Sequence, residues 1–257
     1  MDFAVLGPFR MRDASGVDHT PQPRKQRTAL ALLVVNAGHV VSSGQLREEL
    51  WPESPPPTSA AAVHVYISRL RKHLQRRGTV RVQTRPHGYL VESVDRLDLD
   101  RFRAWTREAR DAQVAGDLES ASTLLRRAVD LWDGAALADV REGVALHHLA
   151  IRLDEEHLAA QEQLVRVNLM LNRHKELVGE LHILVDRYPQ WETFHGYLMI
   201  ALYRAGRTAE ALTAYSRLRE RLVAGLGMEP GPEIQRLHRL MLRRDRELET
   251  SASVHRL

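Results

Sequence analysis

The chain of 257 residues contains no cysteine. This absence excludes disulfide bonds, thiolate catalysis and cysteine-ligated zinc. There is no run of 18 apolar residues, so we expect no membrane-spanning helix. The first residues lack a basic segment followed by a long apolar one, so we expect no secretory signal peptide. A cytoplasmic protein fits these absences best.

A second absence concerns negative charge. No acidic residue occurs between Glu53 and Glu92, a window that holds seven basic side chains and three histidines. The basic residues are Arg69, Arg71, Lys72, Arg76, Arg77, Arg81 and Arg85. Like charges one helical turn apart repel, and a solvated helix face therefore normally mixes signs. The window favours a polyanion such as nucleic acid as a partner; an ordinary basic surface helix is the alternative.

The basic character belongs to the amino-terminal part of the chain. Residues 1–96 hold 14 Lys and Arg against 8 Asp and Glu, a net charge of +6. Residues 97–257 hold 23 basic and 25 acidic side chains, a net charge of −2. Around Val94 to Leu97 the hydrophobic pattern also changes from alternation to long helical periodicity. We therefore expect two domains, 1–96 and 97–257, of which the first binds a polyanion.

The stretch from Thr58 to Arg76 is expected to form one helix. Three prolines precede it, and a threonine or serine is placed to cap its first turn. At about 100° per residue, its apolar side chains share one face: Val63, Ile67, Leu70 and Leu74. The opposite face carries small and basic side chains: Ala61, Val65, Ser68, Arg69, Lys72 and Arg76. One face is thus suited to burial and the other to contact with an anion.

The residues around this helix predict a winged helix. After it, the β-rich runs 79–84 and 89–91 flank the turn Arg85-Pro86-His87-Gly88, which is typical of a hairpin with a basic tip. The elements expected before it are short strands within 3–20, a helix over 24–37 and a helix over 42–51. In such a fold the third helix fits the major groove of DNA, and the wing places a cation in the minor groove.

The second domain is expected to consist of helix pairs. Turn-and-helix patterns begin at Gly116, Asn172 and Gly206, and the last two lie 34 residues apart, the tetratricopeptide period. The first interval is longer, so we expect an irregular segment that includes Gly134 to Gly143. The predicted helices are 102–115, 118–132, 146–171, 175–188, 191–205, 208–224 and 232–244. Stacked pairs leave a concave surface for a partner; structural packing or a dimer interface is the alternative.

The predicted fold class is therefore mainly α with an α+β amino-terminal part. Two motifs look like the recognition helix and wing of OmpR-type regulators: Tyr66-Ile67-Ser68-Arg69-Leu70-Arg71-Lys72 and Arg85-Pro86-His87-Gly88-Tyr89. Further matching motifs are LGP at 6–8, RKQRTAL at 24–30, AGHVVS at 37–42, LWP at 50–52 and RAGRTAEAL at 204–212. Together they resemble the Streptomyces antibiotic regulatory protein family over nearly the whole chain. This resemblance implies an OmpR-type winged helix-turn-helix domain followed by an all-α, tetratricopeptide-like bacterial transcriptional activation domain.

Placement on the helix assigns the first candidate contacts with DNA. Arg69 and Lys72 face away from the apolar stripe, so they reach base edges or phosphates in the major groove, and only arginine does so bidentately to guanine. Weaker candidates on the same side or its margin are Thr58, His64, Val65 and Ser68. Arg71 lies nearer the edge of the core, where a phosphate contact and a structural role are both open.

The resemblance adds two candidates. Arg85 matches the wing arginine of OmpR-type domains, which implies a place in the minor groove. Trp51 matches their Leu-Trp motif, in which the indole N–H meets a phosphate, and core packing is the alternative. By its position at the start of the first helix, the pair Lys25 and Arg27 is a further candidate for phosphate contacts.

The loop that joins the second and third helices is rich in proline. Adjacent prolines favour a stiff, extended linker. In OmpR-type proteins the corresponding loop can touch RNA polymerase, so the resemblance implies a polymerase contact for Glu53, Ser54 and Pro55. The two interpretations remain open at this stage.

No catalytic, metal or cofactor site is expected. The phosphate-binding pattern G-x-x-x-x-G-K-[ST] is absent, and with it the nucleotide-hydrolysing domain of longer family members. A cluster of His147, His148 and His157 near Asp154 has no zinc-motif spacing. A solvated helix face is the simpler explanation for these residues.

We therefore expect a transcriptional activator and not an enzyme. A homodimer would bind direct repeats in double-stranded promoter DNA, spaced by about one turn, and recruit RNA polymerase holoenzyme. Such a protein would be cytoplasmic and associated with the nucleoid. The resemblance also implies pathway-specific control of secondary-metabolite (antibiotic) genes. The alternatives are a repressor with the same DNA-binding mode and a tetratricopeptide-type protein-interaction scaffold.

Overall fold

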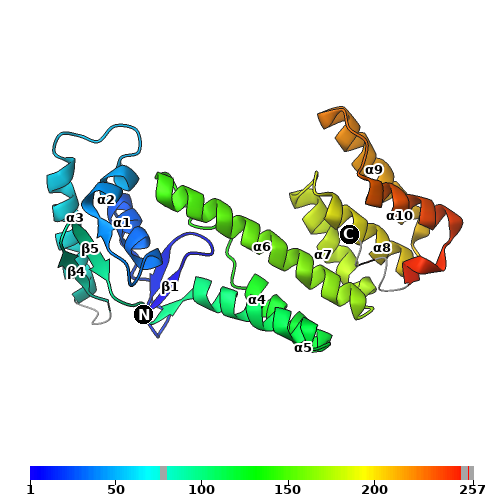
Figure 1. Ribbon diagram of the computed structural model, residues 1–257, viewed down its shortest axis with the longest axis horizontal. Helices are drawn as coiled ribbons and strands as arrows, with labels where there is room; N and C mark the ends of the chain where they lie inside the picture. Colours follow the sequence, from blue (N-terminus) through cyan, green and yellow to red (C-terminus); the bar gives the residue numbers. More distant parts are fainter. Residues whose placement is uncertain (76–79, 250–253, 255–257) are drawn as a thin grey trace. The chain divides into compact units, whose positions relative to one another are not determined.

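The computed structural model describes residues 1–75, 80–249 and 254 and is mainly α-helical, with an α+β part near the amino terminus (Figure 1). Contacts divide the chain into two compact units. Unit 1 comprises Met1–Thr106 and Arg127–Leu158, and unit 2 comprises Arg107–Arg126 and Ala159–Leu257. The domain boundary between residues 96 and 97 remains a prediction, and the compact units divide the chain differently.

The first sheet of unit 1 has three short strands in the order β2-β1-β6. Strand β1 (Asp2–Ala4) pairs antiparallel with β2 (Arg10–Arg12) and parallel with β6 (Arg96–Leu97). A bridge between Arg12 and Asp18 closes the turn after β2. The predicted short strands in this part of the chain are confirmed.

The second sheet contains the wing. Its order is β3-β5-β4, with β5 (Gly88–Val91) antiparallel to both β3 (Val41–Ser42) and β4 (Val82–Arg85). A Cβ atom at Gly88 would lie 2.2 Å from the carbonyl oxygen of Val41. Only glycine therefore lets β5 approach β3 this closely. The predicted hairpin is confirmed where the structure describes it.

Three helices complete the predicted winged-helix plan: α1 (Arg24–Val35), α2 (Ser43–Leu50) and α3 (Ser59–Gln75). Helix α2 begins with a capping box, in which Ser42 and Gln45 satisfy each other's backbone N–H groups. Ser42 is therefore the N-cap of α2, at the start of the predicted range.

Helix α3 has the two faces that its sequence predicts. The four apolar side chains of the predicted buried face are 0–2% exposed: Val63, Ile67, Leu70 and Leu74. The predicted end of the helix at Arg76, the basic residue Arg77 and the first residue of the predicted hairpin lie outside the described residues. The remaining outward face is available for contacts.

The helices of the second half follow the predicted ranges closely. They are α4 (Asp98–Val114), α5 (Leu118–Val129), α6 (Val144–Met170), α7 (His174–Arg187), α8 (Glu192–Arg204), α9 (Thr208–Leu226) and α10 (Pro232–Arg243), followed by the short 3-10 helix η1 (Arg246–Glu249). Between α5 and α6 the chain forms turns, as predicted for this irregular segment. None of the described helices combines the length and apolar character that crossing a membrane requires.

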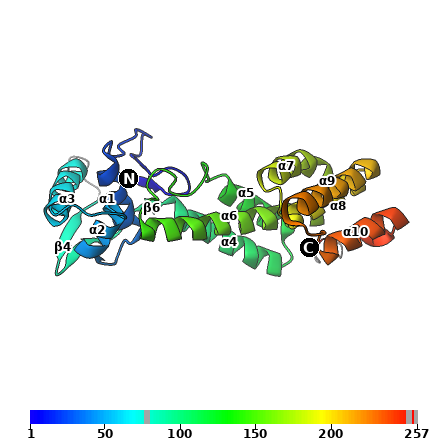
Figure 2. The same ribbon diagram turned by 90° about the horizontal axis from the view of Figure 1, so that it is seen from above.

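Helix α8 is the centre of unit 2. It packs against α7 and α9, and α10 contacts both α8 and α9 (Figure 2). Every residue from Phe194 to Leu202 is buried. This burial on all sides explains why the stretch is apolar except for His195, since a helix covered from every direction needs no polar face.

Glu49 joins the winged helix to the start of α6 within unit 1. Its carboxylate is 3% exposed and accepts hydrogen bonds from the backbone N–H groups of Ala145 at 2.9 Å and Leu146 at 3.1 Å. A Cβ atom at Gly143 would lie 2.3 Å from the Glu49 carboxyl carbon. Negative charge at a helix amino terminus is favourable, so Glu49 caps α6 from a distant part of the sequence.

Asp98 makes a second such connection in unit 1. Its carboxylate accepts from the backbone N–H groups of Val5 at 2.9 Å, Leu6 at 3.1 Å and Leu99 at 2.8 Å. Burial of the carboxyl group outweighs these bonds and raises the pKa of Asp98 to about 6. The group therefore holds a proton more tightly in the folded protein than in the unfolded chain.

We expect the Asp98 carboxyl group to titrate near pH 6, against an ordinary pKa of 3.8. Its contribution to the free energy of unfolding is then fully present below pH 4 and is lost as the pH rises through 6. The loss is about 2–3 kcal/mol, from about 1.4 kcal/mol per pKa unit. Carboxyl carbon NMR measures the midpoint, and Asp98→Asn identifies the signal. A midpoint near 4 contradicts this expectation.

Candidate nucleic-acid interface

The outward face of α3 presents Ser68, Arg69 and Lys72, all exposed. Within the described part of the chain, neither cation has a hydrogen bond or an ion pair. Such side chains exchange water for an external anion without first breaking a protein contact. The positive charge on the predicted DNA-facing side of α3 is therefore not neutralised by the described residues, and it attracts an anionic partner.

The wing places Arg85 at the end of β4, before a turn in which His87 adopts a positive φ of 67°. One guanidinium nitrogen of Arg85 lies 3.5 Å from the Glu92 carboxylate, and the two side chains are 43% and 61% exposed. An exposed pair of this kind contributes at most about 1 kcal/mol. A DNA phosphate or the minor groove can therefore displace Glu92 as the partner of Arg85.

The structure favours a structural role for Arg71, one of the two roles open from the sequence. Its Nε donates to the carbonyl oxygen of Val82 at 2.8 Å, and an Nη atom donates to the Thr84 hydroxyl at 2.7 Å. The guanidinium also lies 5.9 Å from the centre of the Tyr89 ring. These contacts fasten α3 to the wing, so Arg71 orients both parts of the surface.

Tyr89 is a residue whose role the sequence interpretation missed. Its hydroxyl is 2.7 Å from Nδ1 of His64, and burial raises the pKa of the phenol. The hydrogen bond orients the exposed His64 ring on the outer side of α3. The sequence did contain a signal for this role. Tyr89 is an aromatic residue directly after the wing turn, and the alternation of side chains along a strand places it on the side that faces the helix. Thr58, another weaker candidate, is exposed just before α3.

Trp51 packs within the protein. Its ring stacks on Tyr66 with ring centres 6.1 Å apart and an angle of 24° between the planes. The Lys25 ammonium lies 4.4 Å from the centre of the Trp51 ring and also donates to the carbonyl oxygen of Leu50. Burial lowers the pKa of Lys25. These contacts favour packing for Trp51 and capping of the α2 carboxyl end for Lys25.

Arg27 is likewise engaged inside unit 1. Its Nε lies 3.0 Å from the carboxylate of Asp139, which also accepts from the backbone N–H of Phe9 at 2.7 Å. Because this cation has a half-buried partner of opposite charge, it is poorly placed to neutralise a phosphate. Phosphate contacts for Lys25 and Arg27 remain untested predictions, and we leave both residues outside the proposed interface.

The loop between α2 and α3 keeps Glu53, Ser54 and Pro55 exposed. Its end is held by the backbone N–H of Ser59, which donates to the carbonyl oxygen of Pro56 at 2.8 Å. The loop is thus accessible to another protein, and its contact with polymerase remains a prediction.

The histidine cluster of α6 is not simply a solvated face, which corrects our interpretation. His157 is 5% exposed and stacks on Trp132, with ring centres 4.1 Å apart and an angle of 6°. Asp154 accepts from the backbone N–H of Ala136 at 2.9 Å and from Arg141 at 3.1 Å. These contacts hold the irregular segment against α6. Among the described residues, no group of three His, Cys, Asp or Glu side chains could hold a metal ion.

Comparison with protein families finds two matching models. The family described as "Transcriptional regulatory protein, C terminal" matches residues 19–91, and the family described as "Bacterial transcriptional activator domain" matches residues 97–242. The first match contains α3 and the wing. The second covers most of the helical half.

Proteins with similar sequences are named as regulators. The chain is 36% identical to "Regulatory protein DnrI" of Streptomyces peucetius over 255 residues, which cover 95% of this chain and 93% of DnrI. It is 40% identical to "Regulatory protein AfsR" of Streptomyces coelicolor over 245 residues, which cover 95% of this chain but 24% of AfsR. The chain thus corresponds to nearly all of DnrI and to about a quarter of AfsR.

A solved structure has the same fold. Mycobacterium tuberculosis EmbR in complex with a low affinity phosphopeptide superposes with a TM-score of 0.87 at 32% sequence identity. The match covers 99% of this chain and 68% of the EmbR chain. The architecture described above is therefore that of a known transcriptional regulatory protein.

Proposed function

The chain belongs to the Streptomyces antibiotic regulatory protein family of transcriptional regulators, and from this premise we propose that it is a sequence-specific transcriptional activator. In this proposal two copies bind direct repeats near a promoter, spaced by about one DNA turn. Residues 1–96 read the DNA, and residues 97–257 activate transcription by recruiting RNA polymerase holoenzyme. The controlled genes belong to a secondary-metabolite pathway.

One observation carries the DNA-binding part of the proposal. The outward face of α3 holds two exposed cations, Arg69 and Lys72, that have no internal partner among the described residues. An α-helix fits the major groove, where arginine pairs bidentately with guanine and lysine reaches a phosphate or base edge. Arg71 fixes the wing beside the helix. Arg85 at the wing tip then binds in the minor groove, which attracts arginine where it is narrow and rich in A·T pairs.

The test of this function is selection of bound fragments from genomic DNA, followed by titration of the winning fragment against salt. We expect a direct repeat beside a promoter and an affinity that falls steeply as salt rises. A repressor would select the same DNA fragment, but it would reduce transcription from that promoter in an assay with purified polymerase. A protein-interaction scaffold would enrich no sequence, with or without polymerase, and that result would overturn the proposal.

Replacing Arg85 by alanine is expected to weaken operator binding by about 3- to 10-fold, since one groove contact contributes about 1 kcal/mol. The loss should concentrate at A·T-rich positions under the wing, because the narrow minor groove there concentrates negative potential. Binding assays compare the natural operator with one that carries G·C pairs at these positions. Arg110→Ala, which removes an exposed arginine of α4, is the matched control. Equal losses of affinity for the two operators would show that Arg85 does not bind in the minor groove.

The exposed loop supports the polymerase part of the proposal. Replacing Glu53 and Ser54 by alanine is expected to lower transcription in a purified system by several-fold and to leave operator affinity unchanged. Both side chains are exposed, and neither forms a side-chain hydrogen bond or ion pair among the described residues. Parallel transcription and binding assays measure the two effects. Unchanged transcription would mean that the loop is a linker and that polymerase contacts lie elsewhere.

A further inference from the structure

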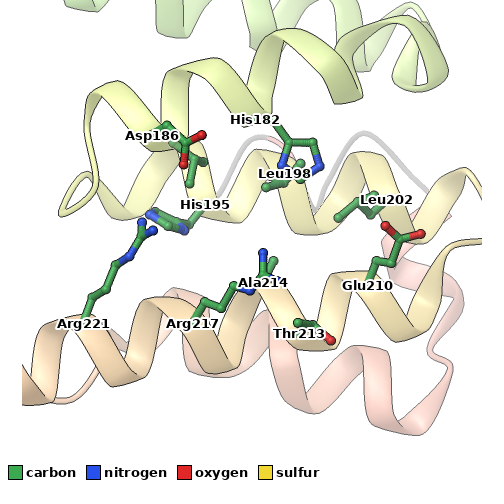
Figure 3. Close-up of a pocket in the computed structure, with 11 residues that line it drawn as sticks. His182, Asp186, His195, Leu198, Leu202, Glu210, Thr213, Ala214, Arg217 and Arg221 are labelled. Atoms are coloured by element: carbon green, nitrogen blue, oxygen red, sulfur yellow. The ribbon is translucent and has the colours of Figure 1, made fainter.

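Unit 2 contains a cavity between α7, α8 and α9 that the proposed function does not use (Figure 3). Its volume is about 130 Å³, which has room for several water molecules or one small organic acid. Apolar side chains of α7 and α8 form part of its wall: Val185, Leu198 and Leu202. Charged and polar side chains from all three helices form the remainder. Mixed walls of this kind are typical of small-ligand sites.

His195 supplies a buried acceptor to this cavity. The side chain is 1% exposed, and its Nε2 lies 3.1 Å from the carbonyl oxygen of Pro189. A carbonyl only accepts hydrogen bonds, so Nε2 carries the proton. Burial lowers the pKa of His195, which keeps the ring neutral and leaves Nδ1 as an acceptor. This Nδ1 atom is buried and has no hydrogen-bond partner among the described residues.

Two arginines one helical turn apart on α9 reach into the cavity. Figure 3 shows the Arg217 and Arg221 side chains extending from α9 towards α8. Neither forms an ion pair or hydrogen bond within the described residues. By contrast, Arg219 of the same helix pairs with Glu229 at 2.6 Å. The arginine on the outside of α9 is thus neutralised, whereas those at the cavity are not.

The other titratable groups at the cavity do not balance these cations. Glu210 lines it but pairs with Arg207 at 2.6 Å. Asp186 of α7 is an exposed acid without an ion pair among the described residues, and His182 is a further exposed basic group. The cavity therefore combines two guanidinium groups that are unpaired among the described residues with one buried acceptor that lacks a donor, the Nδ1 atom of His195. A matching ligand needs one anionic group and an adjacent hydrogen-bond donor.

We propose that this cavity binds a small carboxylic acid that carries a hydroxyl or ammonium group next to its carboxylate. The carboxylate lies on Arg217 and Arg221, since guanidinium groups bind carboxylates through paired hydrogen bonds. The neighbouring donor bonds to Nδ1 of His195. The ligand is a free metabolite of this class, and this inference does not depend on the DNA-binding proposal.

The test uses the full chain with ¹⁵N-labelled histidine. L-malate, succinate, inorganic phosphate and an acetylated tetraglutamate amide are titrated separately while the His195 ring nitrogens are followed by NMR. We expect saturable movement of the Nδ1 signal with L-malate. Succinate, which lacks the hydroxyl donor, should bind at least five-fold more weakly. Replacing Arg217 and Arg221 by glutamine should weaken L-malate binding at least ten-fold.

The matched control is Arg239→Gln with Arg243→Gln, which removes two exposed arginines at the same spacing from α10 and should leave L-malate binding unchanged. Binding of the tetraglutamate peptide alone, which has no hydroxyl or ammonium group next to its carboxylates, would overturn the proposed ligand class. Phosphate binding tighter than all carboxylates would overturn the ligand class. Equal L-malate affinity in the Arg217/Arg221 variant and the natural chain, or no Nδ1 movement with any probe, would overturn the site. Thermal melting of each variant confirms folding.

Discussion

Simultaneous replacement of Arg69 and Lys72 by alanine is expected to lower operator affinity by about 30- to 1,000-fold at physiological salt. An arginine that contacts a base pair contributes about 1–3 kcal/mol, and a cation at a phosphate adds a similar, sequence-independent amount. Both side chains are exposed and unpaired within the described residues, so their loss leaves the fold intact. The slope of log affinity against log salt should also fall by about one to two. Fluorescence anisotropy at several salt concentrations measures both quantities.

The control removes the same charge from a different surface. Arg107 and Arg110 are exposed on α4, and their joint replacement by alanine should change operator affinity by less than about three-fold, through long-range charge alone. If the two double variants lost affinity equally, net charge and not the α3 face would explain binding. Single variants then divide the effect: Arg69→Ala should relax base preference, and Lys72→Ala should weaken all sequences alike.

Replacement of Glu49 by alanine is expected to lower the free energy of unfolding by about 3 kcal/mol. Two backbone N–H groups at the start of α6 lose their buried acceptor, and each unsatisfied donor costs about 1–3 kcal/mol. The α6 amino terminus also loses a favourable negative charge. Urea unfolding measures the change. Glu49→Gln should cost less, about 1 kcal/mol, because it keeps an acceptor oxygen and removes a charge whose burial raises the pKa of Glu49.

Glu48 provides the matched control for this effect. It neighbours Glu49 on α2 but is exposed, so its replacement by alanine should change stability by no more than about 0.5 kcal/mol. Similar losses for the two alanine variants would show that the capping contact contributes nothing specific. A loss confined to Glu49→Ala would establish that the winged helix and the start of α6 stabilise each other.

The sequence by itself determined the helices, the wing and the two faces of α3. These features depend on neighbouring residues: apolar side chains at helical spacing, proline and glycine at turns, and serine at a helix start. Val63 and Leu70 are buried as predicted because the period of the helix fixes which side chains share a face. The exposure of Arg69 and Lys72 follows from the same geometry.

Only the tertiary structure decided which cations remain free for a partner. Arg27 and Asp139 form their ion pair although more than a hundred residues separate them in the chain. The contact between Glu49 and Leu146 spans 97 residues. Local patterns carry no information about such partners, since any exposed acid would satisfy the same pattern. Which cations of α3 and which buried atoms, such as His195 Nδ1, lack a partner among the described residues is therefore decided by the packing of distant segments.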